Sequence, residues 1–306
     1  MTVRTVPGHR WRCVVPSAAA LALAACGCGD RVGSEPPRTA PVGDEAAAPA
    51  QVVLASTDLA VGRERFAFAI LTPEGSPIER ADASVAFYDL DRDDPTVAVA
   101  TADARFYAAR MAAGGLYVVR FDLATAGAWG AEITATLADG RLILPQRVRF
   151  EVAAAPRGVG IGDVPPPTAN RSLATEPNLS KLTSDPQPDA DFYRLSVDEA
   201  AASGRPTVIV FATPGYCVSR ICGPVLDEVK AVKAEAGRAV NFVHIDVYRR
   251  FDPLELADEM GAWGLTTEPW VYVLDAEGRV ADRLEGSVTA AELLPIVQGV
   301  AGRATR

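Results

Sequence analysis

Between residues 51 and 153, apolar and polar side chains alternate in short runs, the period expected of a β-strand with one buried face. Phe66, Phe68 and Ile70 share one face of the expected strand Arg65–Leu71. Turn sequences that contain glycine or proline separate the runs. The pattern predicts an all-β domain made of packed antiparallel sheets. The other expected strands are Leu116–Asp122, residues 132–137 and residues 147–152.

From about residue 190 the pattern changes to buried strands that alternate with amphipathic helices, which predicts a separate α/β domain at residues 191–304. Thr207–Ala212 is a continuous apolar run, as a strand buried on both faces requires. Ser196 and Glu199 form a capping box that opens a helix ending near Gly204. The other expected elements are a helix with a Val225, Val229 and Val232 stripe that stops at Gly237, a strand at Asn241–Val247, a helix at Leu254–Trp263, a hairpin of Trp270–Leu274 with Val280–Leu284, and a last helix capped by Thr289 to Glu292.

Two stretches without periodicity connect these parts. Residues 26–50 are rich in glycine, proline, alanine and acidic residues, and they predict a flexible tether. Residues 154–190 contain seven prolines, which remove backbone donors and favour an extended chain. We therefore expect a semi-rigid linker between the two domains.

The first 25 residues have the pattern of a secretory signal peptide. Three arginines precede an apolar core, Val14 to Ala25, that is too short to span a membrane as a stable helix. The sequence Leu23-Ala-Ala-Cys26 then resembles the lipobox of bacterial lipoproteins. That resemblance implies cleavage before Cys26 and lipidation of its side chain. It also implies an extracytoplasmic protein that its lipid holds on a bacterial membrane, on the periplasmic or cell-surface side.

The charge balance limits the partners of this chain. It carries 30 basic and 39 acidic residues, a formal net charge of −9. Without the three arginines of the signal peptide, 27 basic residues oppose 39 acidic ones, which gives −12. An acidic chain without a cluster of lysine and arginine argues against nucleic acid as a partner. The lipid is the expected membrane attachment, and the sequence predicts no cofactor and no metal.

The five cysteines fall into two groups. Cys13 leaves with the signal peptide, Cys26 carries the lipid and Cys28 lies beside the anchor. Cys217 and Cys222 lie inside a region that folds, where a buried strand meets a helix. The helix dipole and the free N–H groups at a helix start favour the thiolate, the form that attacks disulfides. Export places this pair where disulfides persist.

The residues around this pair resemble those of the thioredoxin fold. Phe211-Ala-Thr-Pro-Gly-Tyr-Cys217 is similar to the strand that leads into the thioredoxin motif, with Tyr216 where thioredoxins have tryptophan. Pro224 resembles the helix proline that follows the cysteines, and Glu268-Pro269 resembles the cis-proline that faces them. The resemblance covers roughly a third of the chain. It implies a thioredoxin-like domain at residues 191–304. The closely spaced strands before it predict an immunoglobulin-like β-sandwich at residues 51–153.

The chain departs from thioredoxins at three points. Four residues separate Cys217 from Cys222 instead of two, so a disulfide requires Cys217 to lie before the helix or in an unwound first turn. Val210 stands where thioredoxins place a buried acid. Glu268 precedes the proline, and its charge would oppose a nearby thiolate, an effect that Arg220 would offset.

The sequence therefore predicts a membrane-anchored thiol–disulfide oxidoreductase. Cys217, nearer to solvent, would attack a disulfide, and Cys222 would resolve the mixed disulfide. Exported proteins with thiols or disulfides are the expected substrates. The expected substrate-facing residues are Tyr216, Arg220, Glu268 and Pro269.

Three alternatives stay open. A structural disulfide would make the domain a non-catalytic interaction scaffold. Thr-Pro-Gly-x-Cys followed by Cys-Gly resembles a subgroup of peroxiredoxins, although Thr213 is one residue too far from Cys217 and Ile209 replaces a proline. Two cysteines and His244, the single histidine of the mature chain, would suit copper. A histidine inside a strand is, however, more often a hydrogen-bonded structural residue.

Overall fold

The computed structural model describes residues 47–109 and 114–304. These residues belong to one compact unit that extends from Glu45 to Arg306. The predicted signal peptide, Cys26, Cys28 and most of the tether lie outside the described residues. Within the described ranges, no helix combines the length and the apolar character needed to cross a membrane.

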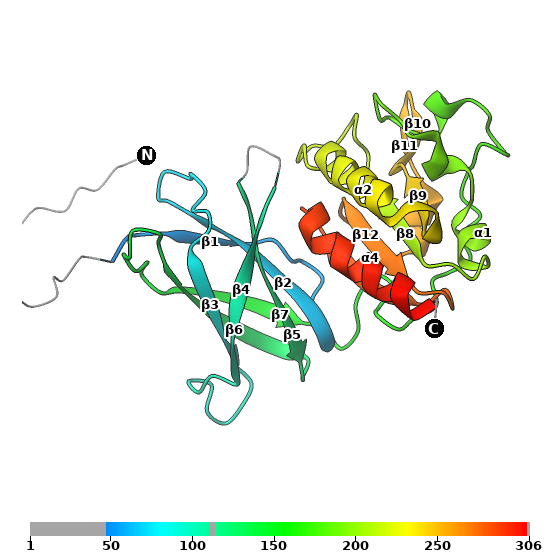
Figure 1. The fold of residues 1–306 in the computed structure, drawn as a ribbon. Coiled ribbons are helices and arrows are strands. Elements are labelled where there is room, and N and C mark those ends of the chain that lie inside the picture. The colour runs from blue at the N-terminus through cyan, green and yellow to red at the C-terminus, as the bar shows by residue number, and fades with distance from the viewer. Residues whose placement is uncertain (1–46, 110–113, 305–306) are drawn as a thin grey trace, which may run out of the picture. The chain divides into compact units, whose positions relative to one another are not determined.

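An antiparallel all-β domain occupies the first described part of the chain, as the alternating pattern predicts (Figure 1). Its strands follow the order β1-β2-β5-β4-β3-β6-β7. Strands β1, β2 and β5 form one layer, and β3, β6 and β7 form the other. Strand β4 pairs with both β5 and β3 and so connects the layers. The strands are β1 (Gln51–Leu54), β2 (Gly62–Leu71), β3 (Asp82–Asp89), β4 (Ala100–Ala108), β5 (Gly115–Leu123), β6 (Gly127–Thr136) and β7 (Gln146–Val152).

Side chains from both layers meet in the interior of this domain. Phe66 of β2 contacts Phe87 of β3 and Phe150 of β7, and the ring centroids are 5.2 Å apart in each pair. Tyr117 and Trp129 are buried in the same core. Buried aromatic pairs contribute apolar area and favourable ring contacts together, so they hold the two layers as an immunoglobulin-like sandwich.

A four-stranded mixed sheet with the order β13-β12-β8-β9 follows. Strands β8 (Thr207–Phe211) and β9 (Asn241–Ile245) are parallel. Strands β12 (Trp270–Leu274) and β13 (Val280–Glu285) are antiparallel to their neighbours. The strands β8, β9 and β12 are buried along their whole length, which explains their continuous apolar runs.

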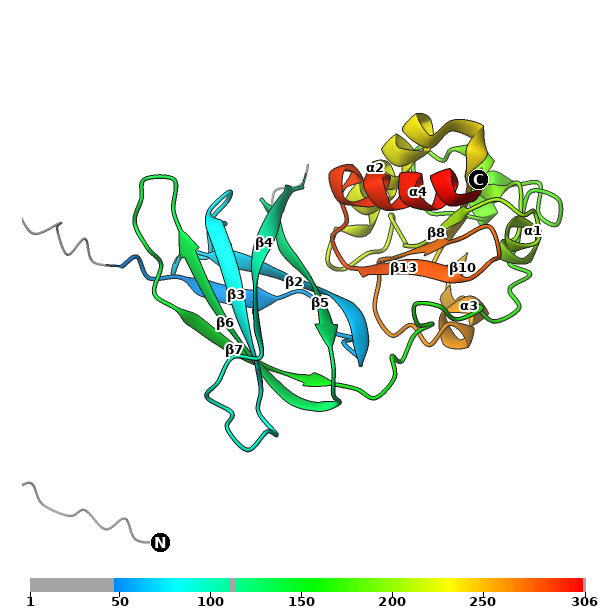
Figure 2. The same ribbon diagram turned by 60° about the horizontal axis from the view of Figure 1, so that its bottom comes forward.

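Helices cover both faces of this sheet (Figure 2). The longer helices α2 (Cys222–Ala236) and α4 (Ala290–Ala304) pack on one face. The shorter helices α1 (Val197–Ala201) and α3 (Asp258–Ala262) pack on the opposite face. This arrangement, with a parallel pair followed by an antiparallel hairpin, is the thioredoxin-like α/β fold that the sequence predicts.

The two predicted helix starts are confirmed. The Ser196 hydroxyl accepts a hydrogen bond from the Glu199 N–H, and the Glu199 carboxylate accepts one from the Ser196 N–H, which completes the capping box. At the start of α4, Thr289 Oγ1 accepts a hydrogen bond from the Glu292 N–H. The Glu292 carboxylate does not return to the helix start, because it pairs with Arg65 of β2.

The helix expected at Leu254–Trp263 is wrong in its first part. Strand β11 (Leu254–Leu256) pairs instead with β10 (Tyr248–Phe251) in a hairpin, and α3 begins only after it. The Glu255 carboxylate forms ion pairs with two arginines of β10. Cross-strand pairing of this kind overrides the weak helical preference of the local sequence.

The proline-rich segment is held against the α/β domain. Thr168, Asn170 and Leu182 are buried. Thr168 Oγ1 accepts a hydrogen bond from the indole N–H of Trp263, and Asn170 Oδ1 accepts one from the backbone N–H of Val197. The segment is therefore tied down by buried hydrogen bonds. The 3-10 turns of the chain are η1 (Leu179–Lys181), η2 (Ala190–Tyr193) and η3 (Gly237–Ala239).

Buried ion pairs join the β-domain to the α/β domain. Arg65 Nε of β2 donates to Glu292 Oε1 of α4 at 2.7 Å. Arg283 of β13 donates to Asp58 Oδ2 at 2.8 Å and to Glu64 Oε1 at 2.7 Å. These pairs were not predicted from the sequence, because their partners lie more than 200 positions apart in the chain.

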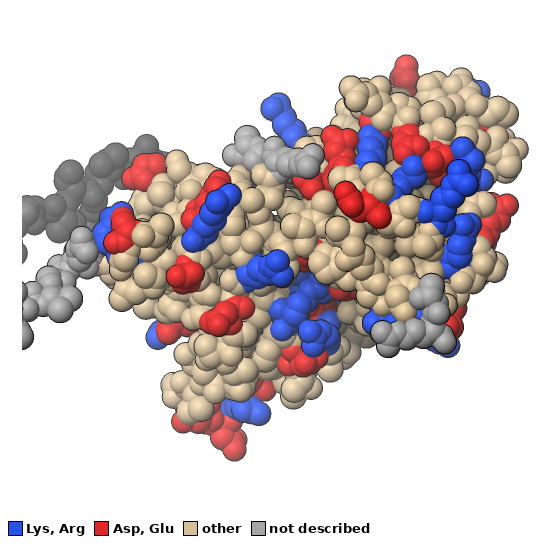
Figure 3. Space-filling model, in the orientation of Figure 1, with Lys and Arg blue, Asp and Glu red and all other residues tan. Residues whose placement is uncertain are grey.

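Acidic and basic side chains are interspersed on the face drawn in Figure 3. Ion pairs also form among the described surface residues, for example Arg147 with Glu132 and Lys233 with Asp189. Such exposed pairs contribute little to stability individually, about 0–1 kcal/mol. They do keep this face free of a broad area of one charge.

Candidate active site at the start of helix α2

The cysteine pair lies where β8 ends and α2 begins. A turn closed by the hydrogen bond from the Tyr216 N–H to the Thr213 carbonyl precedes it. A second turn, from the Arg220 N–H to the Cys217 carbonyl, leads into the helix. Cys217 therefore lies before the helix, as the four-residue gap requires, and it forms a disulfide with Cys222. Their Cα atoms are 6.0 Å apart, inside the usual range for a disulfide.

The two cysteines differ in exposure. Cys222 is fully buried in the core beneath α2, whereas Cys217 is only partly buried. The Ser219 hydroxyl oxygen lies 3.2 Å from Cys217 Sγ. Helix α2 begins without a side-chain cap, so its first N–H groups and the positive end of its dipole remain directed at the pair. These features stabilise negative charge on sulfur when the disulfide is reduced.

The peptide bond between Glu268 and Pro269 is cis, as the resemblance to thioredoxins implies. A carboxylate oxygen of Glu268 lies within 4.8 Å of both sulfur atoms. The Thr213 N–H donates to Glu268 Oε2 at 2.9 Å. Burial raises the pKa of Glu268 to about 7, and the charge of Asp246 adds to the rise. The sequence predicts a charged Glu268 opposite the thiolate. In the structure, the Glu268 carboxyl group is instead partly protonated near neutral pH.

Ser184, in the proline-rich segment, fixes the loop before Cys217. Its hydroxyl accepts a hydrogen bond from the Gly215 N–H at 3.0 Å and donates to Asp246 Oδ2 at 2.7 Å. A Cβ atom at Gly215 would come within 2.9 Å of Ser184 Cβ, so this close approach requires glycine. The roles of Ser184 and Asp246 were not predicted from the sequence, because neither residue belongs to a motif.

Tyr216 lies on the solvent side of the pair. Its ring stacks on that of Phe251 with centroids 5.6 Å apart and meets Tyr248 edge-on at 6.3 Å. A hollow of about 480 Å³ lies beside these rings. Arg220 is exposed in a left-handed conformation, with φ of 60°, and its side chain forms no ion pair with any other residue that the structure describes. Of the expected substrate-facing residues, Glu268 is therefore the one whose side chain lies near both sulfurs. Tyr216 precedes Cys217 in the turn, and the Arg220 charge has no ion-pair partner among the described residues.

His244 is engaged in structural hydrogen bonds. Its Nε2 lies 2.9 Å from the Ala212 carbonyl oxygen, and its Nδ1 lies 2.5 Å from the Tyr193 hydroxyl. Burial lowers the pKa of His244, so the ring is neutral, donates from Nε2 and accepts at Nδ1. The third possible ligand group near the two sulfurs is the carboxylate of Glu268, not the imidazole of His244. In this oxidised form the sulfurs are bonded to each other and are not free to bind a metal.

Comparisons with protein-family models and with curated proteins found no match. Among solved structures, a thioredoxin-family thiol:disulfide interchange protein from Chlorobium tepidum TLS is 24% identical, with 35% of this chain and 86% of that chain covered and a TM-score of 0.27. StoA from Bacillus subtilis is 16% identical, with 38% and 93% covered and a TM-score of 0.28. A human fibronectin type-III domain is 13% identical, with 38% and 94% covered and a TM-score of 0.23. Such low TM-scores carry no argument about this chain, and its fold class rests on the strand order described above.

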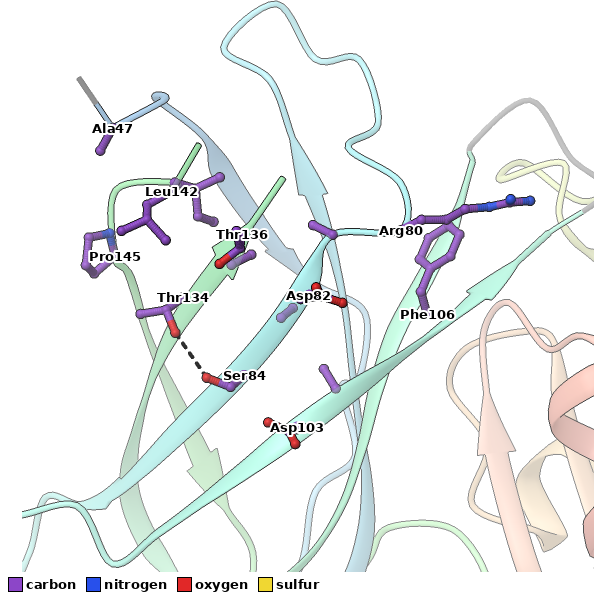
Figure 4. A pocket seen from close by; sticks show the side chains of 15 residues that line it. Ala47, Arg80, Asp82, Ser84, Asp103, Phe106, Thr134, Thr136, Leu142 and Pro145 are labelled. Atoms are coloured by element: carbon purple, nitrogen blue, oxygen red, sulfur yellow. Dashed lines mark hydrogen bonds between the residues drawn. The ribbon is translucent and has the colours of Figure 1, made fainter. Parts of the chain in front are cut away.

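A second hollow, of about 710 Å³, lies in the β-domain (Figure 4). The Ser84 and Thr134 hydroxyls, from the neighbouring strands β3 and β6, are 3.1 Å apart there. Asp82 and Asp103 also line it. Its described lining contains neither cysteine nor histidine, so it offers no thiol for redox exchange. The disulfide region is therefore the candidate active site.

Proposed function

We propose that this chain is an extracytoplasmic thiol–disulfide oxidoreductase that acts through Cys217 and Cys222. The observation that carries the proposal is the asymmetric disulfide at the start of α2, with the Glu268 carboxyl group within 4.8 Å of both sulfurs. Cys217 is only partly buried, so we propose that its sulfur is the one that meets a substrate. The buried sulfur of Cys222 is placed to displace that substrate afterwards.

In the reducing direction, the Cys217 thiolate attacks one sulfur of a substrate disulfide. A bond forms between Cys217 and that sulfur, the substrate disulfide breaks, and the departing sulfur takes up a proton. Cys222 then attacks Cys217 Sγ, which restores the disulfide and releases the second substrate thiol. Two electrons pass from the cysteine pair to the substrate, and the reverse sequence oxidises a substrate dithiol. Exchange with a second protein dithiol or disulfide returns the pair to its starting state.

We propose in addition that a lipid on Cys26 holds the protein on the extracytoplasmic side of a bacterial membrane. That location supports exported proteins with thiols or disulfides as substrates. The acidic net charge of −9 supports protein partners rather than nucleic acid. Tyr216, Arg220 and Pro269 are the proposed substrate contacts around Cys217.

Redox titration of the full-length protein, followed by alkylation and mass analysis of its peptides, tests the proposal. We expect Cys217 and Cys222 to change state together, as one two-electron couple above about −300 mV. Cys217→Ser should abolish exchange with a model disulfide, and Cys222→Ser should trap a mixed disulfide on Cys217. Cys28→Ser, the matched control, should change neither result. A pair that stays oxidised under stronger reduction and traps no partner would favour the scaffold with a structural disulfide.

The same samples separate the remaining alternatives. Rapid oxidation of the reduced pair by a low concentration of peroxide would favour a peroxidase. Copper that copurifies with the chain and is lost in His244→Ala would favour a copper-binding protein. Copper is not expected, because His244 already bonds to Ala212 and Tyr193. Rapid peroxide oxidation is not expected, because Thr213 lies one residue too far from Cys217 for the peroxiredoxin motif.

A further inference from the structure

We infer that Glu268 is the proton donor and acceptor for the Cys217–Cys222 pair. This inference rests on the proposed exchange reaction and adds a group to it that acts on the reacting sulfurs. The residue stands directly before Pro269, and one of its carboxylate oxygens lies within 4.8 Å of both sulfurs.

The geometry fits proton transfer. One carboxylate oxygen lies within 4.8 Å of each sulfur, a separation that one bridging water spans. The Thr213 N–H holds Glu268 Oε2 at 2.9 Å. No other described residue donates a hydrogen bond to Glu268, so its second oxygen remains available to a sulfur-bound proton.

The surroundings keep both protonation states of Glu268 accessible. The titratable groups that face it are the two cysteines at the start of α2 and Asp246 at the end of β9. Within the described ranges, no lysine or arginine forms an ion pair with it. Burial without a cation raises the pKa of Glu268 to about 7. A group that accepts a proton in one step and returns it in the next works best near this value.

No acid on β8 can take this role. Val210, the position at which thioredoxins carry a buried acid, is fully buried in this chain and apolar. Glu268 is the acidic residue whose donor atom groups with the two sulfurs in the part of the chain that the structure describes. The proton acceptor has thus moved from the strand beneath the pair to the loop that faces it.

The protons and electrons balance without a further reactant. When Cys222 resolves the mixed disulfide, its thiol gives a proton to the Glu268 carboxylate, and the new thiolate attacks Cys217 Sγ. The bond between Cys217 and the substrate breaks, and the departing substrate thiolate takes the proton back from the Glu268 carboxylic acid. One protein dithiol and one substrate disulfide become one protein disulfide and two substrate thiols, and Glu268 ends in its starting form.

The test compares the full-length wild-type protein with Glu268→Gln and with Glu277→Gln. Glu277 is exposed in the turn between β12 and β13, so its replacement removes the same charge away from the sulfurs. The reduced proteins are oxidised with hydroxyethyl disulfide from pH 5 to pH 9, and the decay of the mixed disulfide on Cys217 is followed by mass spectrometry. We expect the wild-type decay to show an inflection near pH 7 that Glu268→Gln lacks, with a decay about 100-fold slower. Glu277→Gln should match the wild type.

The outcomes separate this inference from the proposed function. Normal exchange with an unchanged pH profile in Glu268→Gln would overturn the role of Glu268 and leave the oxidoreductase standing. Absence of exchange in the wild type and both variants would overturn the proposed function and, with it, this inference. Carbon NMR of the glutamate carboxyl groups in the oxidised protein gives a reading that needs no activity. A Glu268 midpoint near 7 supports the inference, whereas one near the ordinary 4.5 overturns it.

Discussion

Replacing Arg283 by methionine is expected to destabilise the protein strongly. The Arg283 side chain is 2% exposed, and its guanidinium donates to the carboxylates of Asp58 and Glu64 and to the Asp58 carbonyl oxygen. Methionine fills much of the same volume but leaves Glu64 without its cation and Asp58 with only the half-exposed Arg157, whose Nε is 3.5 Å from Asp58 Oδ1. Removing one partner of a buried ion pair typically costs about 3–5 kcal/mol, and we expect a loss of that size at pH 8.

The loss should depend on pH because the two carboxylates differ. Burial favours protonation of Asp58, but hydrogen bonds from the Arg157 and Gly158 N–H groups, together with Arg283, lower the pKa of Asp58 overall. Burial raises the pKa of Glu64 even in the presence of Arg283. In Arg283→Met, Glu64 is therefore the group that takes up a proton as the pH falls. Each pH unit below its raised pKa restores about 1.4 kcal/mol, so the loss should be smaller at pH 5 than at pH 8.

Urea unfolding at both pH values, followed by tryptophan fluorescence and circular dichroism, measures these free energies. Trp129 reports on the β-domain and Trp270 on the α/β domain. Arg279→Met, on the same hairpin, removes an exposed guanidinium that donates to the Gly162 carbonyl oxygen, and it should cost less than about 1 kcal/mol. Adding Glu64→Gln to Arg283→Met should recover part of the loss. A loss below about 1 kcal/mol at pH 8, or an equal loss at both pH values, would refute the reasoning.

Three further predictions concern the active-site loop, Glu268 and the anchor. Gly215→Ala should lower the free energy of unfolding by about 1–3 kcal/mol, because the new Cβ would lie 2.9 Å from Ser184 Cβ; Ser184→Gly should recover part of this loss in urea titrations. For Glu268, the folded pKa of about 7 exceeds the ordinary 4.5, so the wild type should lose stability as the pH rises through this window, whereas Glu268→Gln should not. The quantity to compare is the free energy of unfolding of the wild type and of Glu268→Gln, from thermal or urea unfolding. After allowance for partial exposure, we expect the difference between the two proteins to grow by roughly 1.5–3 kcal/mol from pH 4 to pH 9 and to stay constant above pH 9. Cys26→Ala should move the protein from the membrane fraction to the soluble fraction, and continued sedimentation with membranes would contradict the lipid anchor.

Alternation along the chain predicted several of the strands whose inward side chains are large, but not β3 with its buried Val85 and Phe87. The expected strands at Arg65–Leu71 and Leu116–Asp122 correspond to β2 and β5 within a few residues. Strand β4 gave no such signal, because small residues such as Ala102 and Ala104 pack against the core. The hairpin of β10 and β11 was mistaken for a helix, because its pairing depends on contacts that local helical preference does not contain.

The cysteines and the cis-proline were predictable because they belong to a compact motif. Ser184 was not, since it acts on Gly215 from 31 positions away and from a segment without periodicity. The sequence also suggested a charged Glu268 that opposes a thiolate. Its ionisation depends on burial and on the distant Asp246, and only the three-dimensional structure brings these factors together.

The contrast between two sets of acids strengthens the functional argument. At the junction of the domains, Asp58 and Glu64 are neutralised by Arg283. Glu268, beside the disulfide, receives one N–H and forms no ion pair with any described residue. An acid buried without a cation reduces stability whenever it is ionised, so a fold that pairs the buried Asp58, Glu64 and Glu292 with arginine gives up stability at Glu268. Because such perturbed groups concentrate at functional sites, the unpaired acid supports a reactive disulfide rather than a purely structural one.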